Sequence, residues 1–166
     1  VEGKVDEGYT SLPLDGPKVI REGADITVIA SSYMTLEAMM AAEALAEVGV
    51  SIEVLDLRVS RPLELGKIKK SVHKTGNLLT VDLGWKSFGV GAEIISSIAE
   101  QDFKHLKTAP RRLGLPDHPT PSSIGLVKNY YQDAVSIANT ITEMLDVPAE
   151  RFQSAINALK KKRQNN

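Results

Sequence analysis

The stretch Asp82-Leu-Gly-Trp-Lys-Ser-Phe-Gly-Val-Gly-Ala-Glu-Ile94 joins the end of an apolar run to the start of an amphipathic segment. The run that precedes it, Asn77 to Asp82, is apolar and β-rich and predicts a buried strand. Gly89 and Gly91, one residue apart, then lead into a segment whose isoleucines recur at helical spacing. The glycine pair alone carries little weight. A strand followed closely by a helix, however, is the repeating unit of an α/β domain.

The rest of the chain repeats this alternation. Further strands are expected at residues 18–21, 26–31, 52–57 and 111–115. Further helices are expected at 35–48, from after Pro62 to near Gly76, and at 132–145. Only four residues separate the strand at 18–21 from the next, which is too short for a parallel crossover, so this strand should pair antiparallel. The helix after Gly91 is expected to turn Ile94, Ile95 and Ile98 inward and Glu93, Ser97, Glu100 and Gln101 outward. The pattern predicts a three-layer α/β domain.

The organisation along the chain is expected to be a linker segment at 1–16, one domain at 17–147 and an added helix with a basic tail at 148–166. In the added helix Phe152, Ala155, Ile156 and Leu159 recur at helical spacing. This apolar face must cover either its own domain or a neighbour. The Lys160–Arg163 run is either a solvated tail that ends the helix or a site for a phosphate or an acidic partner.

Composition excludes several classes of protein. The chain has 166 residues, 42% of them hydrophobic, which suits one domain with a real core. A formal charge of −1 gives no general attraction to nucleic acid or membrane, and no apolar run approaches the ~20 residues of a membrane span. Cysteine is absent, which excludes disulfides and thiolate chemistry.

No secretory leader is visible, so we expect a cytoplasmic protein, or a mitochondrial matrix protein in a eukaryote. The initial valine suggests a processed or excised piece.

Ligands of such a sheet bind at the carboxyl ends of its strands. The polar residues expected there are Ser31, Ser32, Asp56, Asp82 and Asp117. A phosphoacceptor domain needs acids after the first parallel strand, and that position holds none, which argues against this class.

Two features of the glycine stretch have alternative explanations. The Gly89–Gly91 pair either cradles a phosphate at a helix N-terminus or allows the helix to pack closely on the sheet, and the second explanation is favoured. Trp85 either anchors a subunit contact or fills the rim of the core.

The three histidines, His73, His105 and His118, are far apart in sequence and show no ligand spacing. His73 lies in a basic helix end, where a cation suits the helix dipole. His105 is expected to be a solvated surface residue. His118 lies in a proline-rich loop near a strand end, where a functional residue could be placed, although a structural role is favoured. No Ser-His-Asp arrangement can be argued from this order.

Several segments carry a family resemblance. They are Arg21-Glu-Gly-Ala-Asp-Ile-Thr-Val-Ile-Ala30, Met34 with Glu37-Ala38 and Ala41-Ala42-Glu43, Glu53-Val-Leu-Asp-Leu-Arg-Val-Ser-Arg-Pro-Leu-Glu64, the glycine stretch, Leu115-Pro-Asp-His-Pro-Thr-Pro-Ser-Ser123, and Tyr130-Tyr131. Together they resemble the C-terminal domain of the transketolase superfamily over about residues 9 to 145. The sequence is most similar to the beta subunit of the decarboxylating component of 2-oxo acid dehydrogenase complexes (pyruvate, branched-chain or acetoin type).

The resemblance implies a mixed five-stranded sheet with one antiparallel strand. It also implies that thiamine diphosphate and a divalent metal bind between two other domains, so this chain supplies no catalytic, cofactor-binding or metal residue. The family's C-terminal domain stabilises a homodimer or heterotetramer and can offer a docking face to the acyltransferase core. The implied interface residues are Trp85, Gly89, Gly91, Asp117, His118, Ser122 and Ser123. Arg58 and Pro62 match the family's turn after the second strand. There the guanidinium would tie loop carbonyls together and the proline would stop the strand.

The sequence also departs from the family. Ser32-Tyr33 replaces a glycine and a small residue, and Leu83 replaces an acid, so any polar contact of that acid is lost. Asp117-His-Pro stands where many relatives have an aliphatic residue before the proline. The thiamine-binding domains and their metal motif are absent from the chain, which alone is expected to bind no thiamine diphosphate and to decarboxylate nothing.

Two functions therefore remain. The first is the assembly domain of a 2-oxo acid dehydrogenase beta subunit, whose full enzyme decarboxylates a 2-oxo acid and passes the acyl group to lipoamide. Its partners would be the missing thiamine-binding domains or an alpha subunit, and no nucleic acid or membrane. The second is a free-standing interaction module, motivated by Leu83 and the added helix. A 1-deoxyxylulose-5-phosphate synthase has a segment like Arg112-Leu-Gly-Leu-Pro-Asp117, but Gly84-Trp85 and Gly91-Ala-Glu-Ile94 argue against it.

Overall fold

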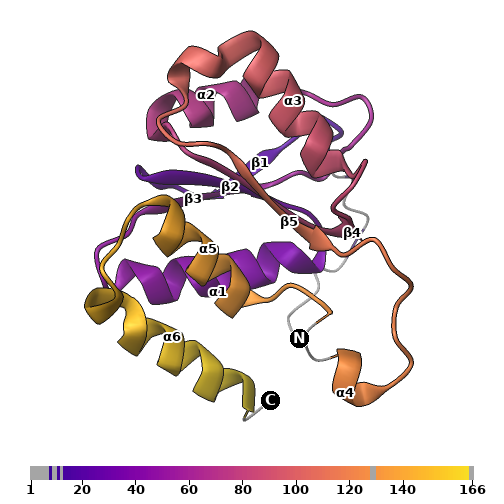
Figure 1. Ribbon diagram of the computed structural model, residues 1–166. Helices are drawn as coiled ribbons and strands as arrows, with labels where there is room; N and C mark the ends of the chain where they lie inside the picture. The colour runs from indigo at the N-terminus through magenta and orange to yellow at the C-terminus, as the bar shows by residue number, and fades with distance from the viewer. Residues whose placement is uncertain (1–7, 9–10, 12, 128–129, 165–166) are drawn as a thin grey trace.

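A mixed sheet with helices on both faces forms the centre of the protein, as seen in a computed structural model that describes residues 8, 11, 13–127 and 130–164 (Figure 1). In the described chain, five strands lie in the order β1-β3-β2-β4-β5. They are β1 (Lys18–Arg21), β2 (Ile26–Ala30), β3 (Ile52–Asp56), β4 (Leu78–Trp85) and β5 (Arg111–Leu115). Helices α2 (Gly66–Thr75) and α3 (Val90–Asp102) cover one face; α1 (Tyr33–Ala46), α5 (Ala134–Met144) and α6 (Ala149–Gln164) lie on the other. The predicted three-layer α/β/α architecture is confirmed.

The first strand has the direction expected from its short connection. β1 pairs antiparallel with β3, with Lys18 opposite Asp56, whereas the pairs β2–β3, β2–β4 and β4–β5 are parallel. The connection from β1 to β2 passes closely over the start of β3. A Cβ at Gly23 would lie only 2.1 Å from the carbonyl carbon of Ile52, so glycine is required there.

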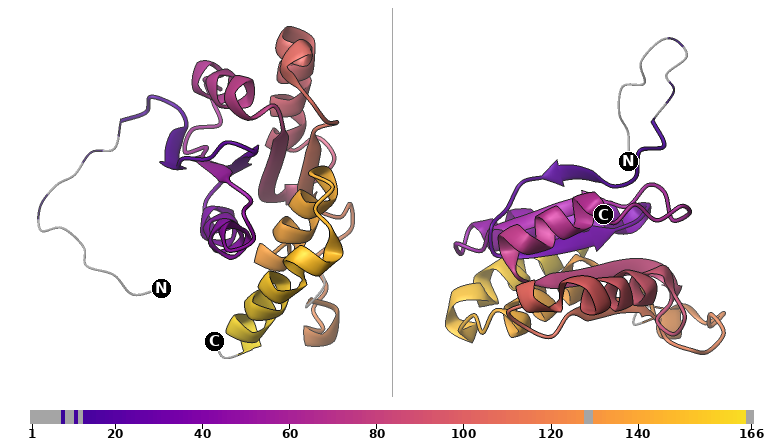
Figure 2. Two further views of the ribbon diagram at one scale, coloured as in Figure 1. Left: turned by 90° about the vertical axis from the view of Figure 1, so that its left-hand side faces the viewer. Right: turned by 90° about the horizontal axis from the view of Figure 1, so that it is seen from above.

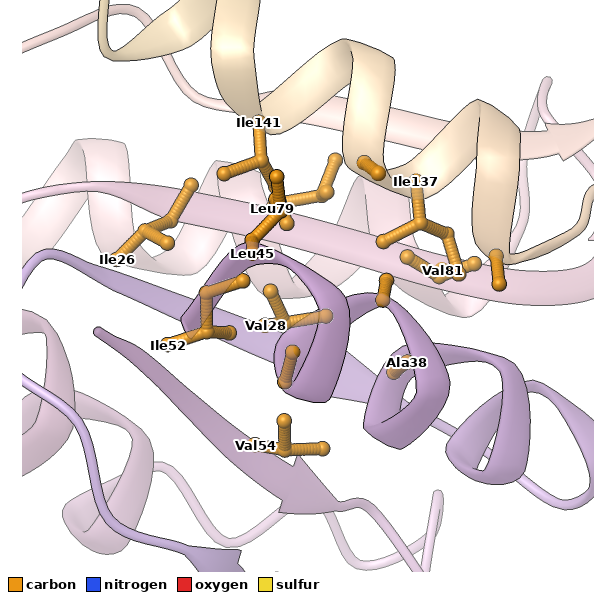
Figure 3. Packing of buried hydrophobic residues seen from close by; sticks show 14 of the residues in the cluster. Ile26, Val28, Ala38, Leu45, Ile52, Val54, Leu79, Val81, Ile137 and Ile141 are labelled. Carbon is orange, nitrogen blue, oxygen red and sulfur yellow. The ribbon is translucent and has the colours of Figure 1, made fainter. Parts of the chain in front are cut away.

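Successive residues of a strand point to opposite faces of the sheet and pack into two separate hydrophobic cores. Val28 of β2 packs with α1, α5 and α6, whereas its neighbour Ile29 packs with α2 and α3. Figure 3 shows the first of these cores, where Val28, Leu79 and Ile141 come from two strands and one helix. Because both faces are covered, β2, most of β3 and the first five residues of β4 are buried, as expected for the central strands of a parallel sheet.

Two local expectations were wrong. β4 continues past Asp82 to Trp85, because its end pairs again with β5 after an irregularity that brings Trp85 opposite Leu115. Ser97 was expected to face outward but is buried, and its hydroxyl is 3.4 Å from Oε1 of Glu93 one helical turn away. A serine can be buried when a neighbour on the helix accepts a hydrogen bond from its hydroxyl, which helical periodicity alone does not reveal.

The added helix covers its own domain. Ala155, Ile156 and Leu159 of α6 are buried in the core that contains α1 and α5, and Figure 2 shows α6 (yellow) beside α5 (orange). The helix includes the Lys160–Arg163 run and ends directly after it, at Gln164. Lys160 and Lys161 are exposed on its last turns, where positive charge suits the helix dipole.

Most of the expected linker at 1–16 lies outside the described residues. None of the described helices is both long enough and apolar enough to cross a membrane. The remaining short elements are the 3₁₀ helix η1 (Phe103–His105) and the helix α4 (Ile124–Val127). The first connects α3 to β5, and the second lies in the loop between β5 and α5 (Figure 1).

Candidate functional site

The carboxyl ends of the parallel strands meet at one edge of the sheet, and we call the surface there the carboxyl-edge surface. The acids expected at this edge are engaged in shaping its loops. Oδ1 of Asp82 accepts the backbone N–H of Gly84 at 2.5 Å, and Oδ1 of Asp56 lies 3.5 Å from the hydroxyl of Thr35. Oδ2 of Asp117 accepts the Ser87 hydroxyl. These carboxylates therefore act separately as loop acceptors, which differs from the shared cluster of a phosphoacceptor site.

The two glycines bring the start of α3 against β4. A Cβ at Gly91 would lie 2.4 Å from the Thr80 hydroxyl oxygen, and a Cβ at Gly89 would lie 2.4 Å from the carbonyl oxygen of Trp85. Both approaches exclude a side chain. The glycines are thus explained by contacts within the protein, which supports close packing as the reason for them.

Trp85 lies beside the proline-rich loop that follows β5. A pocket of about 230 Å³ is lined by Trp85, Asp117, His118 and Pro119. The backbone N–H of Lys86 donates to the carbonyl of Leu115 at 2.8 Å, which fixes the two loops against each other together with the Ser87–Asp117 bond. The structure therefore brings together three of the predicted interface residues, Trp85, Asp117 and His118.

A buried tyrosine side chain holds the loop around His118 in place. The hydroxyl of buried Tyr130 donates to the backbone carbonyl of His118 at 2.9 Å, and the two rings are 5.3 Å apart. Nδ1 of His118 lies 3.2 Å from the carbonyl oxygen of Pro119, and the side chain is exposed. Ser122 and Ser123 are exposed further along, and the carbonyl of Ser123 accepts the N–H groups of Leu126 and Val127 at the start of α4.

Large apolar side chains are exposed at this edge, and most of them were missed by sequence reasoning. Trp85 is 61% exposed, Leu83 is 37% exposed and Phe88 is fully exposed. Phe88 also has a φ of 58°, a left-handed conformation that costs a residue with a Cβ roughly 1–2 kcal/mol. Further exposed members on the elements that meet here are Tyr33, Leu36, Ile124, Leu126 and Tyr131. For Phe88, Ile124 and Leu126, the available signal was an apolar residue outside any predicted helix or strand.

Arg58 organises the loop after β3. Its guanidinium donates to the carbonyl of Pro13 at 3.3 Å and lies 3.7 Å from the carboxylate of Asp15. The hydrogen bond from Lys67 to Asp15, 2.7 Å long, holds the pKa of that carboxyl below its usual value. The expectation that Pro62 stops the strand is wrong, because β3 already ends at Asp56.

The histidines are arranged differently from the sequence expectation. The rings of His73 and His105 are stacked with centroids 3.7 Å apart, although the residues are distant in sequence. Nε2 of His73 lies 2.9 Å from Oδ1 of Asp102, and that hydrogen bond lowers the pKa of the Asp102 carboxyl. The expectation of an isolated, solvated His105 is therefore wrong; the side chain is half-buried against this group.

Comparison with known proteins identifies the family. Residues 17–151 match the family described as Transketolase, C-terminal domain. The chain belongs to this transketolase C-terminal domain family. The pyruvate dehydrogenase E1 component subunit beta, mitochondrial, of Pisum sativum is 44% identical over 121 residues, which are 73% of this chain and 34% of that protein. The acetoin:2,6-dichlorophenolindophenol oxidoreductase subunit beta of Cupriavidus necator is 32% identical over 138 residues, 83% of this chain and 41% of that protein.

Solved structures show the same fold. A split gene transketolase, described as an inactive beta4 tetramer, superposes with a TM-score of 0.71 at 22% identity, covering 86% of this chain and 47% of that one. This chain therefore spans about a third of the length of the pea protein. It spans less than half of the length of the Cupriavidus protein and of the split gene transketolase.

Proposed function

We propose that this chain is the C-terminal assembly domain of a thiamine diphosphate-dependent 2-oxo acid dehydrogenase beta subunit. The matches to pyruvate dehydrogenase E1 beta and acetoin oxidoreductase beta subunits support this role. The full enzyme would decarboxylate a 2-oxo acid oxidatively and transfer the acyl group to lipoamide. The thiamine-binding domains or an alpha subunit would join this chain in a homodimer or heterotetramer, and the acyltransferase core would be a further partner. We propose the cytoplasm, or the mitochondrial matrix of a eukaryote, as its location.

The observation that carries the proposal is the exposed apolar part of the carboxyl-edge surface. Trp85 at the end of β4 and Phe88 in the β4–α3 loop are exposed, and Trp85 lines the pocket together with Asp117 and His118. Exposed aromatic side chains beside a pocket are typical of a protein contact, because aromatic anchors dominate binding energies. The left-handed φ of Phe88 also supports a protein contact at this surface, because strained backbone conformations are common at functional sites.

The other predicted interface residues would act in different ways. Gly89 and Gly91 would set the position of the β4–α3 loop, since both contact the sheet too closely for a side chain. Asp117 would hold that loop through Ser87, so that Trp85 is presented in one position. Ser122 and Ser123, exposed before α4, would contribute polar contacts at the rim.

The described residues do not fit a bound thiamine diphosphate. The two glycines are explained by packing rather than by a diphosphate, because a Cβ would meet Thr80 at Gly91 and the Trp85 carbonyl at Gly89. Asp82 accepts the N–H of Gly84 through Oδ1, and its Oδ2 faces Gly89 and Gly91, where a carboxylate would repel a diphosphate. The cofactor and its metal would therefore be held by the other domains, and the role of this chain is assembly.

The test is reconstitution from separate pieces. We would mix the purified chain with the remaining thiamine-binding part of the parent beta subunit and its alpha subunit, and measure association by size-exclusion chromatography with light scattering. A double variant, Trp85→Ala with Phe88→Ala, should weaken association at least about tenfold, because interface aromatics are frequent hot spots.

Phe103→Ala is the matched control. Phe103 is also an exposed phenylalanine, but it lies on η1, between α3 and β5, and its loss should leave association unchanged. If the wild-type chain does not associate, or if both variants weaken association equally, the assembly role through this surface is wrong.

A second candidate is a free-standing interaction module of the same fold. The packing of α6 onto its own domain supports this alternative, since the helix needs no neighbour to cover it. An immunoblot of source-cell extract distinguishes the two. A band much larger than 18.0 kDa supports the assembly domain, and a band at 18.0 kDa supports the module.

A further inference from the structure

Two histidines and one aspartate converge at the edge of the sheet opposite the carboxyl-edge surface. His73 lies on the last turn of α2, just before β4 begins, and Asp102 and His105 lie at the ends of α3 and η1, before β5. One ligating atom from each of the three side chains lies within 4.8 Å of the others. These groups take no part in the proposed assembly contact.

We propose that His73, Asp102 and His105 form a binding site for a divalent first-row transition ion of the zinc type. Two imidazoles and one carboxylate are ligands that Zn²⁺ accepts, and with three protein ligands a fourth position remains for water. Calcium or magnesium would prefer a set made of oxygens alone.

The carboxylate of Asp102 is placed to serve as a single-oxygen ligand. Its Oδ1 atom lies 2.9 Å from Nε2 of His73, whereas Oδ2 is 3.1 Å from the ammonium of Lys69. Lys69 is itself fixed by the side-chain oxygen of Gln101 at 2.7 Å. An outer partner of this kind orients a ligand, so Oδ2 can stay beside Lys69 while the ion replaces the hydrogen bond between Oδ1 and Nε2 of His73.

The two imidazoles need one adjustment. Their rings are stacked with an angle of 27° between the planes, whereas an ion binds in the plane of each ring. The ring of His105 must therefore turn out of the stack, and its half-buried position at the end of η1 leaves it a solvent-facing side. His73 is 38% exposed, which provides a path for the ion from solvent. The bound ion would join the end of α2 to the end of α3.

Zinc titration of the 166-residue chain without a tag tests the site. Isothermal titration calorimetry should give one Zn²⁺ per chain, and Co²⁺ should give the visible absorption bands of a four-coordinate ion. We expect zinc binding to weaken at least about tenfold in each of the variants His73→Gln, His105→Gln and Asp102→Asn, because each variant loses one of only three protein ligands. The matched control is His118→Gln, which removes the remaining histidine and should leave binding unchanged.

Ring stacking gives a second readout that does not depend on the variants. In NMR spectra, Zn²⁺ should shift the ring protons of both His73 and His105, because His105 leaves the stack. The proposal is overturned if the wild-type chain binds no stoichiometric Zn²⁺. It is equally overturned if correctly folded His73→Gln and His105→Gln proteins bind zinc as the wild type does.

Discussion

The carboxylate of Glu37 in α1 accepts a 2.7 Å hydrogen bond from the backbone N–H of Ala134, the first residue of α5. Glu37 is only 2% exposed, so this charge is buried between two helices. The first N–H groups of a helix have no partner within it, and a negative charge there also suits the helix dipole. The pair therefore fixes where α5 begins relative to α1. Asp133 and Ser136 complete the start of α5 with a capping box.

Replacing Glu37 by alanine should destabilise the protein by about 1–3 kcal/mol, because the buried N–H of Ala134 then loses its acceptor. Urea denaturation measures the change. Glu43→Ala is the control, since Glu43 is exposed on the same helix and its loss should stay within about 0.5 kcal/mol. Equal effects for the two variants would show that the Glu37 bond contributes nothing to stability.

Gly91→Ala should also destabilise the fold. The new methyl group would lie 2.4 Å from the Thr80 hydroxyl oxygen, so α3 must move away from β4 at a cost of about 1–3 kcal/mol. Thermal unfolding followed by circular dichroism measures this cost. At Gly125 a Cβ would be 3.8 Å from its neighbour, so Gly125→Ala should unfold like the wild type. A Gly91→Ala protein of unchanged stability would contradict the close packing of α3 on β4.

Lys74 should give stability a defined dependence on pH. Its ammonium bridges the carboxylates of Glu22 and Glu53, and the hydrogen bond with Glu22 raises the pKa of Lys74 and lowers the pKa of Glu22. The Glu22 contribution is present above the unfolded carboxyl pKa, about 4.3, and is lost as the pH falls through the lowered folded pKa. The Lys74 contribution is present below the unfolded amine pKa, about 10.4, and is lost as the pH rises through the raised folded pKa.

The stability difference between the wild type and Lys74→Met should therefore be constant from about pH 6 to 9 and shrink at both extremes. At neutral pH we expect about 1–3 kcal/mol, because the buried carboxylate of Glu53 loses its cation. Urea denaturation at a series of pH values measures the difference. Lys70 is an exposed lysine on the same helix, and the stability difference between the wild type and Lys70→Met should be much smaller. A Lys74→Met difference that does not change with pH would contradict the ion-pair explanation.

The C-terminal helix should behave as part of the folded domain. Leu159 is buried in the main core, so Leu159→Ala should cost about 2–5 kcal/mol. Lys160→Ala, one residue later on the exposed side, should have little effect. Chemical denaturation of both variants measures the contrast. If Leu159→Ala were as stable as Lys160→Ala, α6 would not be packed against α1 and α5 in solution.

Local sequence pattern predicted the elements well, because each depends on residues close together in the chain. The β1, β2, β3 and β5 strands lie within a residue of their expected bounds, and α2 ends before Gly76 in a left-handed C-cap, as glycine favours. The end of β4 was missed because its last pairing, Trp85 with Leu115, depends on a strand more than twenty residues away.

The candidate site was only partly predictable for the same reason. Trp85, Asp117 and His118 could be placed at the carboxyl edge, because each follows the apolar part of a predicted parallel strand. The stacked pair His73 and His105 could not be found by spacing, since α2 and η1 are separated by β4 and α3 along the chain and come together only in the folded protein.

The sequence by itself determined the family, the three layers and the antiparallel direction of β1, because hydrophobic periodicity and connection length act locally. Only the tertiary structure decided that β1 pairs with β3, that α6 covers its own core, and that Glu37 meets the start of α5. It alone also brought His73, Asp102 and His105 together. These relationships arise from packing between segments that are distant in sequence. The local pattern is compatible with several arrangements of the helices and strands, and the free energy of apolar burial and hydrogen bonding decides which one forms.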